Sequence, residues 1–165
     1  MKFALFYHSL VSDWNHGNAH FLRGVVRELI ELGHTVEVYE PADGWSLTHL
    51  IEEQGQTALA EFRSAFPELK SHFYTEEQLD LDCILDDLDI VLVHEWTPPS
   101  LVARIGQTAE QLGVRAYFHD THHRSVTDAA SMSALDLSRY EGVLAFGETI
   151  AECYRKNGWA RQVCE

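Results

Sequence analysis

Short apolar runs alternate with amphipathic stretches along most of the chain. Residues 2–8 (KFALFYH) and 35–39 (TVEVY) have the length and composition of β-strands. Between them, residues 18–32 carry apolar side chains at helical spacing, and Gly33 follows, a residue that readily adopts the left-handed conformation in which helices end. The first forty residues therefore predict a strand, a polar loop, a helix and a second strand.

The same alternation continues through the rest of the sequence. Residues 89–94 (DIVLVH) are apolar on both faces, as a strand inside a parallel sheet requires. The pattern also predicts one or two helices over 46–66, a short strand at 72–74, an acidic helix over 76–88, a helix over 97–112, strands at 114–118 and 142–146, and a helix over 148–157, with a long polar connection over 120–136. This order predicts an α/β fold: a Rossmann-like, open, mostly parallel sheet with helices on both faces.

Length and composition narrow the class of protein. The 165 residues suit a single Rossmann-like domain over residues 1–165. The net charge of −14, with no basic cluster, argues against a nucleic-acid-binding protein. No apolar stretch is long enough for a membrane span. Three cysteines without CxxC spacing indicate reduced thiols, and we expect a cytoplasmic protein.

Polar residues gather where the predicted strands end. Seven of the ten histidines follow or lie near these positions: His8, His16, His20, His94, His119, His122 and His123. Because the carboxyl ends of parallel strands share one edge of a sheet, and ligands usually bind at that edge, these histidines predict a ligand site.

The loop before the first helix is one candidate. Residues 15–18 bring small side chains to the helix N-terminus, where free backbone N–H groups can bind a phosphate or carboxylate. The loop has neither a GxGxxG fingerprint nor a Walker sequence. It is equally consistent with a plain turn that uses Asn and Gly for their backbone freedom.

Residues 119–124 (HDTHHR) all have side chains that can bind a ligand or take part in catalysis. This segment allows three interpretations. A metal site is one, but metal-ligand spacing is missing, so we expect no metal and no cofactor. Recognition of a hydroxyl-rich or phosphorylated ligand is the second, because these side chains supply both donors and acceptors. The third is structural, with Asp120 capping a helix over residues 121–124. We favour recognition.

Glu95 follows the buried strand at 89–94 and has two interpretations. It could act as a carboxylate base, or it could be a loop acid beside Trp96 without a special role. The three thiols have no adjacent base, so a cysteine nucleophile is not predicted.

Several segments together resemble the N-terminal domain of GT-B glycosyltransferases. KFALFYHSLVSDWNHGNAHFLRGVVRELIELGHTVEVYEP is similar to the opening strand, glycine-bearing loop, helix and second strand of that family. DIVLVHEW and VRAYFHDTHHR resemble its middle strands, and GVLAFGETIAECYRKNGWARQV resembles its closing strand and helix in the subgroup related to spore-maturation glycosyltransferases. The resemblance covers nearly the whole chain.

The family architecture implies two Rossmann-like domains facing a cleft, of which the N-terminal one mainly shapes the acceptor site. The resemblance implies a catalytic role for His119 near the transferred sugar. It also implies a set of ligand-binding residues: His16, Gly17 and Asn18 near the donor phosphates, and Asp120, His122 and His123 along the cleft. We add Glu95 to this set because it follows a buried strand.

We therefore expect the N-terminal, acceptor-side half of a glycosyltransferase, with the C-terminal donor domain absent from this chain and no turnover by the chain alone. Its expected partners are a nucleotide-sugar donor and an unknown acceptor. An apolar face near Trp159 and Val163 predicts self-association. Two alternatives stay open: a non-catalytic ligand- or partner-binding module of Rossmann or flavodoxin-like shape, and a metal hydrolase that uses the histidines.

Overall fold

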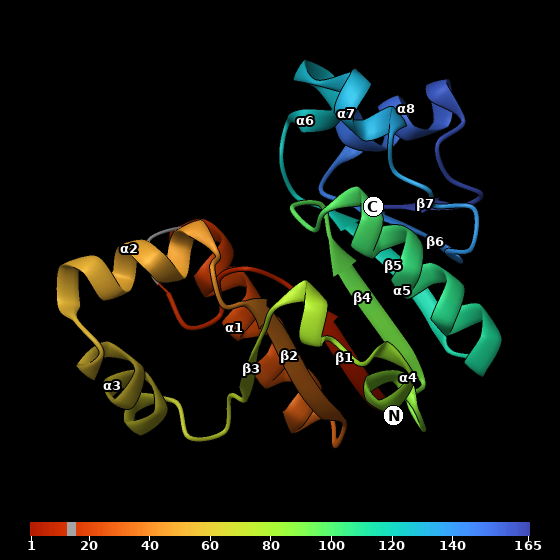
Figure 1. The fold of residues 1–165 in the computed structure, drawn as a ribbon. Helices are drawn as coiled ribbons and strands as arrows, with labels where there is room; N and C mark the ends of the chain where they lie inside the picture. Colours follow the sequence, from red (N-terminus) through yellow and green to blue (C-terminus); the bar gives the residue numbers. More distant parts are fainter. Residues whose placement is uncertain (13–15) are drawn as a thin grey trace. The chain divides into compact units, whose positions relative to one another are not determined.

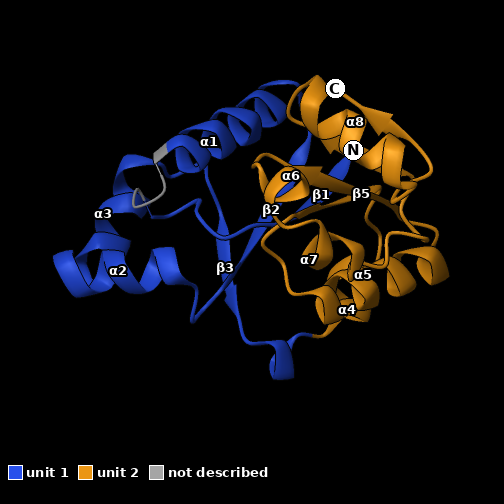
Figure 2. Ribbon diagram, turned by 90° about the horizontal axis from the view of Figure 1, so that it is seen from above, with its two compact units in different colours: residues 1–79 blue, residues 80–165 orange. Residues whose placement is uncertain are grey.

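The computed structural model describes residues 1–12 and 16–165, and for His16 only the backbone. Asn15, part of the predicted anion-binding loop, lies outside the described residues. The chain forms two compact units, Met1–Leu79 and Asp80–Glu165, which Figure 2 shows in blue and orange.

Unit 1 is a three-stranded parallel sheet with its connecting helices (Figure 1). Its elements are β1 (Lys2–Phe6), α1 (His16–Glu31), β2 (Thr35–Pro41), α2 (Trp45–Gln54), α3 (Thr57–Ala65), β3 (Ser71–Tyr74) and the 3₁₀ turn η1 (Glu76–Gln78). The strand order is β3-β2-β1, with Lys2 paired to Thr35 and Val38 paired to Ser71. The predicted strand–loop–helix–strand opening is confirmed.

Buried polar residues fix the loop that follows β1. The backbone N–H of Leu10 donates to Glu40 Oε1 at 2.7 Å, and Arg23 Nε donates to the carbonyl of Leu10 at 2.8 Å. Glu40 and Arg23 are themselves buried. Since buried backbone groups need partners, these two side chains allow the loop to pack inside unit 1.

Unit 2 is a four-stranded parallel sheet in the order β4-β5-β6-β7. Its elements are α4 (Leu81–Leu85), β4 (Ile90–His94), α5 (Pro99–Leu112), β5 (Arg115–Asp120), α6 (Arg124–Thr127), α7 (Ala129–Ser133), β6 (Gly142–Ala145), α8 (Glu148–Asn157) and β7 (Val163–Cys164). His94 pairs with His119, and Asp120 pairs with Ala145. This register places the last residues of β4 and β5 side by side.

The core of unit 2 forms where α5 packs along the sheet (Figure 1). Leu101, Val102 and Ile105 are buried on its inner face, as their helical spacing predicts. The hydroxyl of Tyr140 donates to the carbonyl of Val102 at 2.8 Å, which holds the tyrosine ring beside Gly106.

The α/β, Rossmann-like fold class is confirmed, and each strand pairing within the two units is parallel. The acidic helix predicted over 76–88 is wrong. That stretch contains η1 and then the five-residue α4, whose N-terminus is capped by Asp80 through a hydrogen bond from the backbone N–H of Cys83. Asp80 therefore starts a new helix within the stretch expected to be continuous.

The predicted polar connection over 120–136 also needs correction. Strand β5 continues through Asp120, and the short helices α6 and α7 follow. Asp120 does not cap a helix, because α6 starts only at Arg124 and its N-cap position is His123. Strand β7 was not predicted. Among the described helices, none is both long and apolar enough to cross a membrane.

Candidate functional site

Five polar residues come together at the carboxyl ends of β4 and β5 in unit 2. We call them the polar cluster: His94, Glu95, Asp120, Thr121 and His122. The parallel register explains the convergence, since the backbone N–H of Glu95 donates to the carbonyl of His119 at 3.0 Å and so extends the β4–β5 ladder. This confirms, for the strands of unit 2, that strand-end residues meet at one edge.

Glu95 is the centre of the polar cluster. Its side chain is completely buried, and its Oε1 accepts a hydrogen bond from the backbone N–H of Thr121 at 2.9 Å. The same oxygen lies 2.8 Å from His122 Nδ1. Because 26% of the His122 side chain is exposed, a buried carboxylate here orients an imidazole that solvent can reach.

The hydroxyl of Thr121 touches both histidines of the cluster. Its Oγ1 lies 3.0 Å from His94 Nε2 and 3.0 Å from His122 Nδ1. It also donates to Glu95 Oε1 at 3.3 Å. The two imidazoles and the carboxylate therefore converge on one hydroxyl oxygen.

Asp120 is the second buried carboxyl group of the cluster. Burial, and then repulsion from Glu95, raise its pKa to about 7, although a hydrogen bond from the Tyr154 hydroxyl at 2.9 Å acts in the opposite direction. Glu95 Oε2 is buried and accepts no hydrogen bond from a donor group, while the Asp120 carboxyl group lies within hydrogen-bonding reach of Glu95. Asp120 is therefore partly protonated near neutral pH, beside the carboxyl group of Glu95.

His119 precedes Asp120 on β5 and is also buried. It is 7% exposed, and its ring contacts that of His94 edge to face at a centroid distance of 5.8 Å. Burial lowers the pKa of His119 to about 4, so its imidazole is neutral at neutral pH. The catalytic role of His119 stays a prediction, and a neutral imidazole suits hydrogen bonding to a hydroxyl better than pairing with a phosphate.

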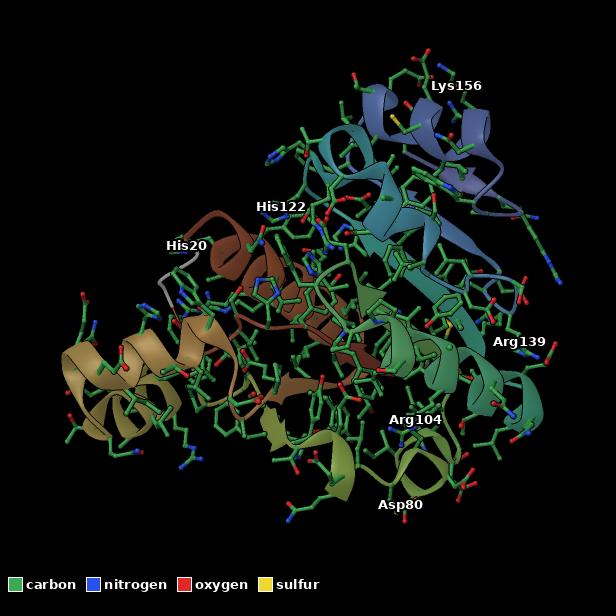
Figure 3. All side chains as sticks on the ribbon, turned by 45° about the horizontal axis from the view of Figure 1, so that its top comes forward. His20, Asp80, Arg104, His122, Arg139 and Lys156 are labelled. Carbon is green, nitrogen blue, oxygen red and sulfur yellow. The ribbon has the colours of Figure 1, made fainter. Side chains whose placement is uncertain are left out.

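An exposed aromatic and a cation border the cluster. Trp96 is 48% exposed, and its ring lies edge to face with that of His122, at a centroid distance of 5.6 Å. The Arg124 guanidinium lies 4.5 Å from the centroid of the Trp96 ring, and its Nη1 donates to the carbonyl of Glu95 at 2.9 Å. Figure 3 labels His122 among the nitrogen-bearing side chains of this region.

The other predicted site residues lie elsewhere. His123 is exposed, and its ligand-binding role stays a prediction. His16, Gly17 and Asn18 form the first turn of α1 in unit 1, where Gly17 is exposed and Asn18 Nδ2 is buried without a hydrogen-bond partner among the described atoms. Their role near donor phosphates stays a prediction.

Some residues of the site were given no individual role from the sequence. His94 was expected at the ligand edge and Thr121 lies within the HDTHHR segment, and the signal for both is their position at or just after a strand end. Tyr154 reaches Asp120 from α8, 34 residues further along the chain, and no local pattern indicates that contact.

Comparison with known proteins does not assign the chain to a family. No protein-family model matches the sequence, and no curated protein matches it significantly. A functional assignment therefore depends on the geometry of the polar cluster and on the motifs of the sequence itself.

Proposed function

We propose that this chain is the acceptor-side half of a GT-B-type glycosyltransferase, and that the polar cluster binds hydroxyl groups of the sugar or acceptor. The observation that carries the proposal is the contact between Glu95 and His122. A completely buried carboxylate orients a partly exposed imidazole at the carboxyl ends of two parallel strands, where α/β proteins bind ligands.

Hydroxyl-rich ligands suit the chemistry of this surface. A sugar hydroxyl both donates and accepts hydrogen bonds, and an imidazole can do either. The exposed Trp96 ring, with Arg124 beside it, offers a flat apolar surface next to these polar groups. Sugar rings stack on such surfaces while their hydroxyl groups bond to polar neighbours.

Glycosyl transfer also requires a proton acceptor. The bond between the anomeric carbon and the donor phosphate breaks, a bond to the acceptor oxygen forms, and the acceptor hydroxyl loses its proton. His122, supported by Glu95, can accept that proton, while His119 supplies a neutral hydrogen-bonding group. In this proposal the nucleotide-sugar donor is held mainly by a second domain, and the protein is cytoplasmic, in keeping with its three free thiols.

The test is a donor screen with the natural polypeptide that contains this chain. Common uridine- and guanosine-diphosphate sugars are each incubated with the protein, and release of nucleoside diphosphate is measured. We expect release from at least one donor. If no donor is consumed by folded protein, with or without candidate hydroxyl acceptors, the glycosyltransferase proposal is wrong and the binding-module alternative is favoured.

A further inference from the structure

Two imidazoles and one carboxylate in the polar cluster form a set of metal-ligand type. One ligand atom each from His94, Glu95 and His122 lies within 4.8 Å of the others. His94 and Glu95 are buried, and His122 is partly exposed. Two imidazoles with one carboxylate form a donor set typical of zinc, in which a further position is open to water.

The three groups already point toward a common position. Thr121 Oγ1 lies 3.0 Å from His94 Nε2, 3.0 Å from His122 Nδ1 and 3.3 Å from Glu95 Oε1. Ligand atoms around a tetrahedral zinc ion are roughly 3.3 Å apart, given metal–ligand bonds of about 2.0–2.1 Å. Rotation of the Thr121 side chain and small movements of the three ligands would bring them to this spacing, and Glu95 Oε1 and His122 Nδ1, now 2.8 Å apart, would separate slightly.

The charges around Glu95 provide a second, independent argument. Glu95 Oε2 is completely buried and receives no hydrogen bond from a donor group. The Glu95 side chain also interacts with the buried carboxyl group of Asp120. The nearby Arg124 guanidinium bonds to the backbone carbonyl of Glu95 instead of its carboxylate. Buried acidic groups without full partners are costly, and a bound divalent cation would remove that cost.

We propose that His94, Glu95 and His122 bind one divalent transition-metal ion, zinc being the best fit to the ligands. Binding replaces the contact between Glu95 Oε1 and His122 Nδ1 with bonds from both atoms to the metal. The inference does not depend on glycosyl transfer. If both hold, bound metal occupies the imidazole nitrogen that faces Glu95 and competes with the role proposed for His122.

Cobalt(II) is a suitable probe, because a protein-bound ion of low coordination number absorbs visible light more strongly than the hydrated ion. We expect one equivalent of cobalt(II) to produce a visible absorption band from the protein-bound ion. Added zinc should displace the cobalt and abolish this band. His122→Ala and Glu95→Gln should weaken binding by more than the roughly 10- to 100-fold cost of disturbing an outer-sphere partner. The adjacent, exposed His123→Ala is the matched control and should retain the band.

The comparison of variants distinguishes specific binding at these three ligands from non-specific binding by surface histidines. The proposal is wrong if the wild-type chain shows no cobalt band. It is also wrong if His122→Ala binds cobalt with the same affinity as the wild-type chain. His122 is partly exposed, so its replacement should preserve folding, and circular dichroism checks this for each variant. This experiment measures metal binding alone. A negative result therefore says nothing about the glycosyltransferase proposal, which the donor screen tests separately.

Discussion

At the scale of single residues, the site depends on how differently its neighbouring groups are buried. Glu95 is inaccessible to solvent, whereas the side chain of its partner His122 is 26% exposed. A buried carboxylate keeps a fixed orientation, and an exposed ring can meet a ligand. This division suits a site in which one residue positions another.

The ionisation of His119 provides a residue-scale prediction for the metal-free protein. Because its folded pKa of about 4 is below the value of about 6.5 for an unfolded chain, the unfolded state binds more protons between these values. The contribution of His119 to the free energy of unfolding is therefore complete above pH 6.5 and is lost as the pH falls toward 4.

NMR of the imidazole resonances measures this directly in chelator-treated protein. We expect the His119 signals, assigned with a His119→Gln variant, to stay at neutral-ring positions from pH 8 down to about 5. A midpoint near 6.5 would show that the ring is not buried as described.

Part of the polar cluster could be located from the sequence. Glu95, Asp120 and His122 could be selected because each follows or ends an apolar run that predicts a strand. The raised pKa of Asp120 beside Glu95 could not be foreseen. It depends on the β4–β5 register and on burial, which arise only when the sheet forms.

At the scale of elements, two helical glycines differ in whether the surrounding packing leaves room for a side chain. A Cβ added at Gly24 in α1 would meet nothing within 4 Å. A Cβ added at Gly106 in α5 would lie 2.8 Å from Tyr140 Cε2. The Tyr140 ring cannot easily move, because its hydroxyl is bonded to the carbonyl of Val102.

Alanine substitutions at these two glycines should therefore have opposite effects. Gly24→Ala should raise the free energy of unfolding by about 0.5–1 kcal/mol, since alanine is the better helix former. Gly106→Ala should lower it by about 1–3 kcal/mol through overpacking. Urea denaturation of both variants measures the difference. Stabilisation by Gly106→Ala would contradict the packing of α5 against Tyr140.

The long helices were predictable and the shortest helices were not. Residues 18–32 and 97–112 contain enough turns for an apolar face to appear in the sequence, and α1 and α5 are found there. Helices of four or five residues, such as α6 and α4, are too short to display that period. Their positions depend on local hydrogen bonds such as the cap at Asp80.

At the scale of the whole molecule, the net charge bears on which part of a sugar donor this chain could hold. A charge of −14 repels the anionic diphosphate of a nucleotide sugar at long range. An uncharged, hydroxyl-bearing acceptor meets no such repulsion. The composition therefore supports an acceptor-side role more than a donor-side role.

Self-association also belongs to this scale and stays a prediction. Strand β7, only two residues long, forms an edge of the unit 2 sheet, and Val163 and Trp159 nearby are partly exposed. Unpaired strand edges favour contact with a second copy. We expect light scattering under reducing conditions to show a mass that rises with concentration. The mass of a single chain at every concentration would contradict this.

The central claim is that the contact between Glu95 and His122 serves sugar transfer, and one comparison tests it most directly. In the natural polypeptide, with the donor identified by the screen, kcat/KM is measured for His122→Ala and for a control variant, His72→Ala. We expect a loss of about 100-fold or more for His122→Ala. We expect a change of less than about two-fold for the control, because His72 is an exposed residue of β3 in unit 1. Equal activity of the two variants would contradict the central claim.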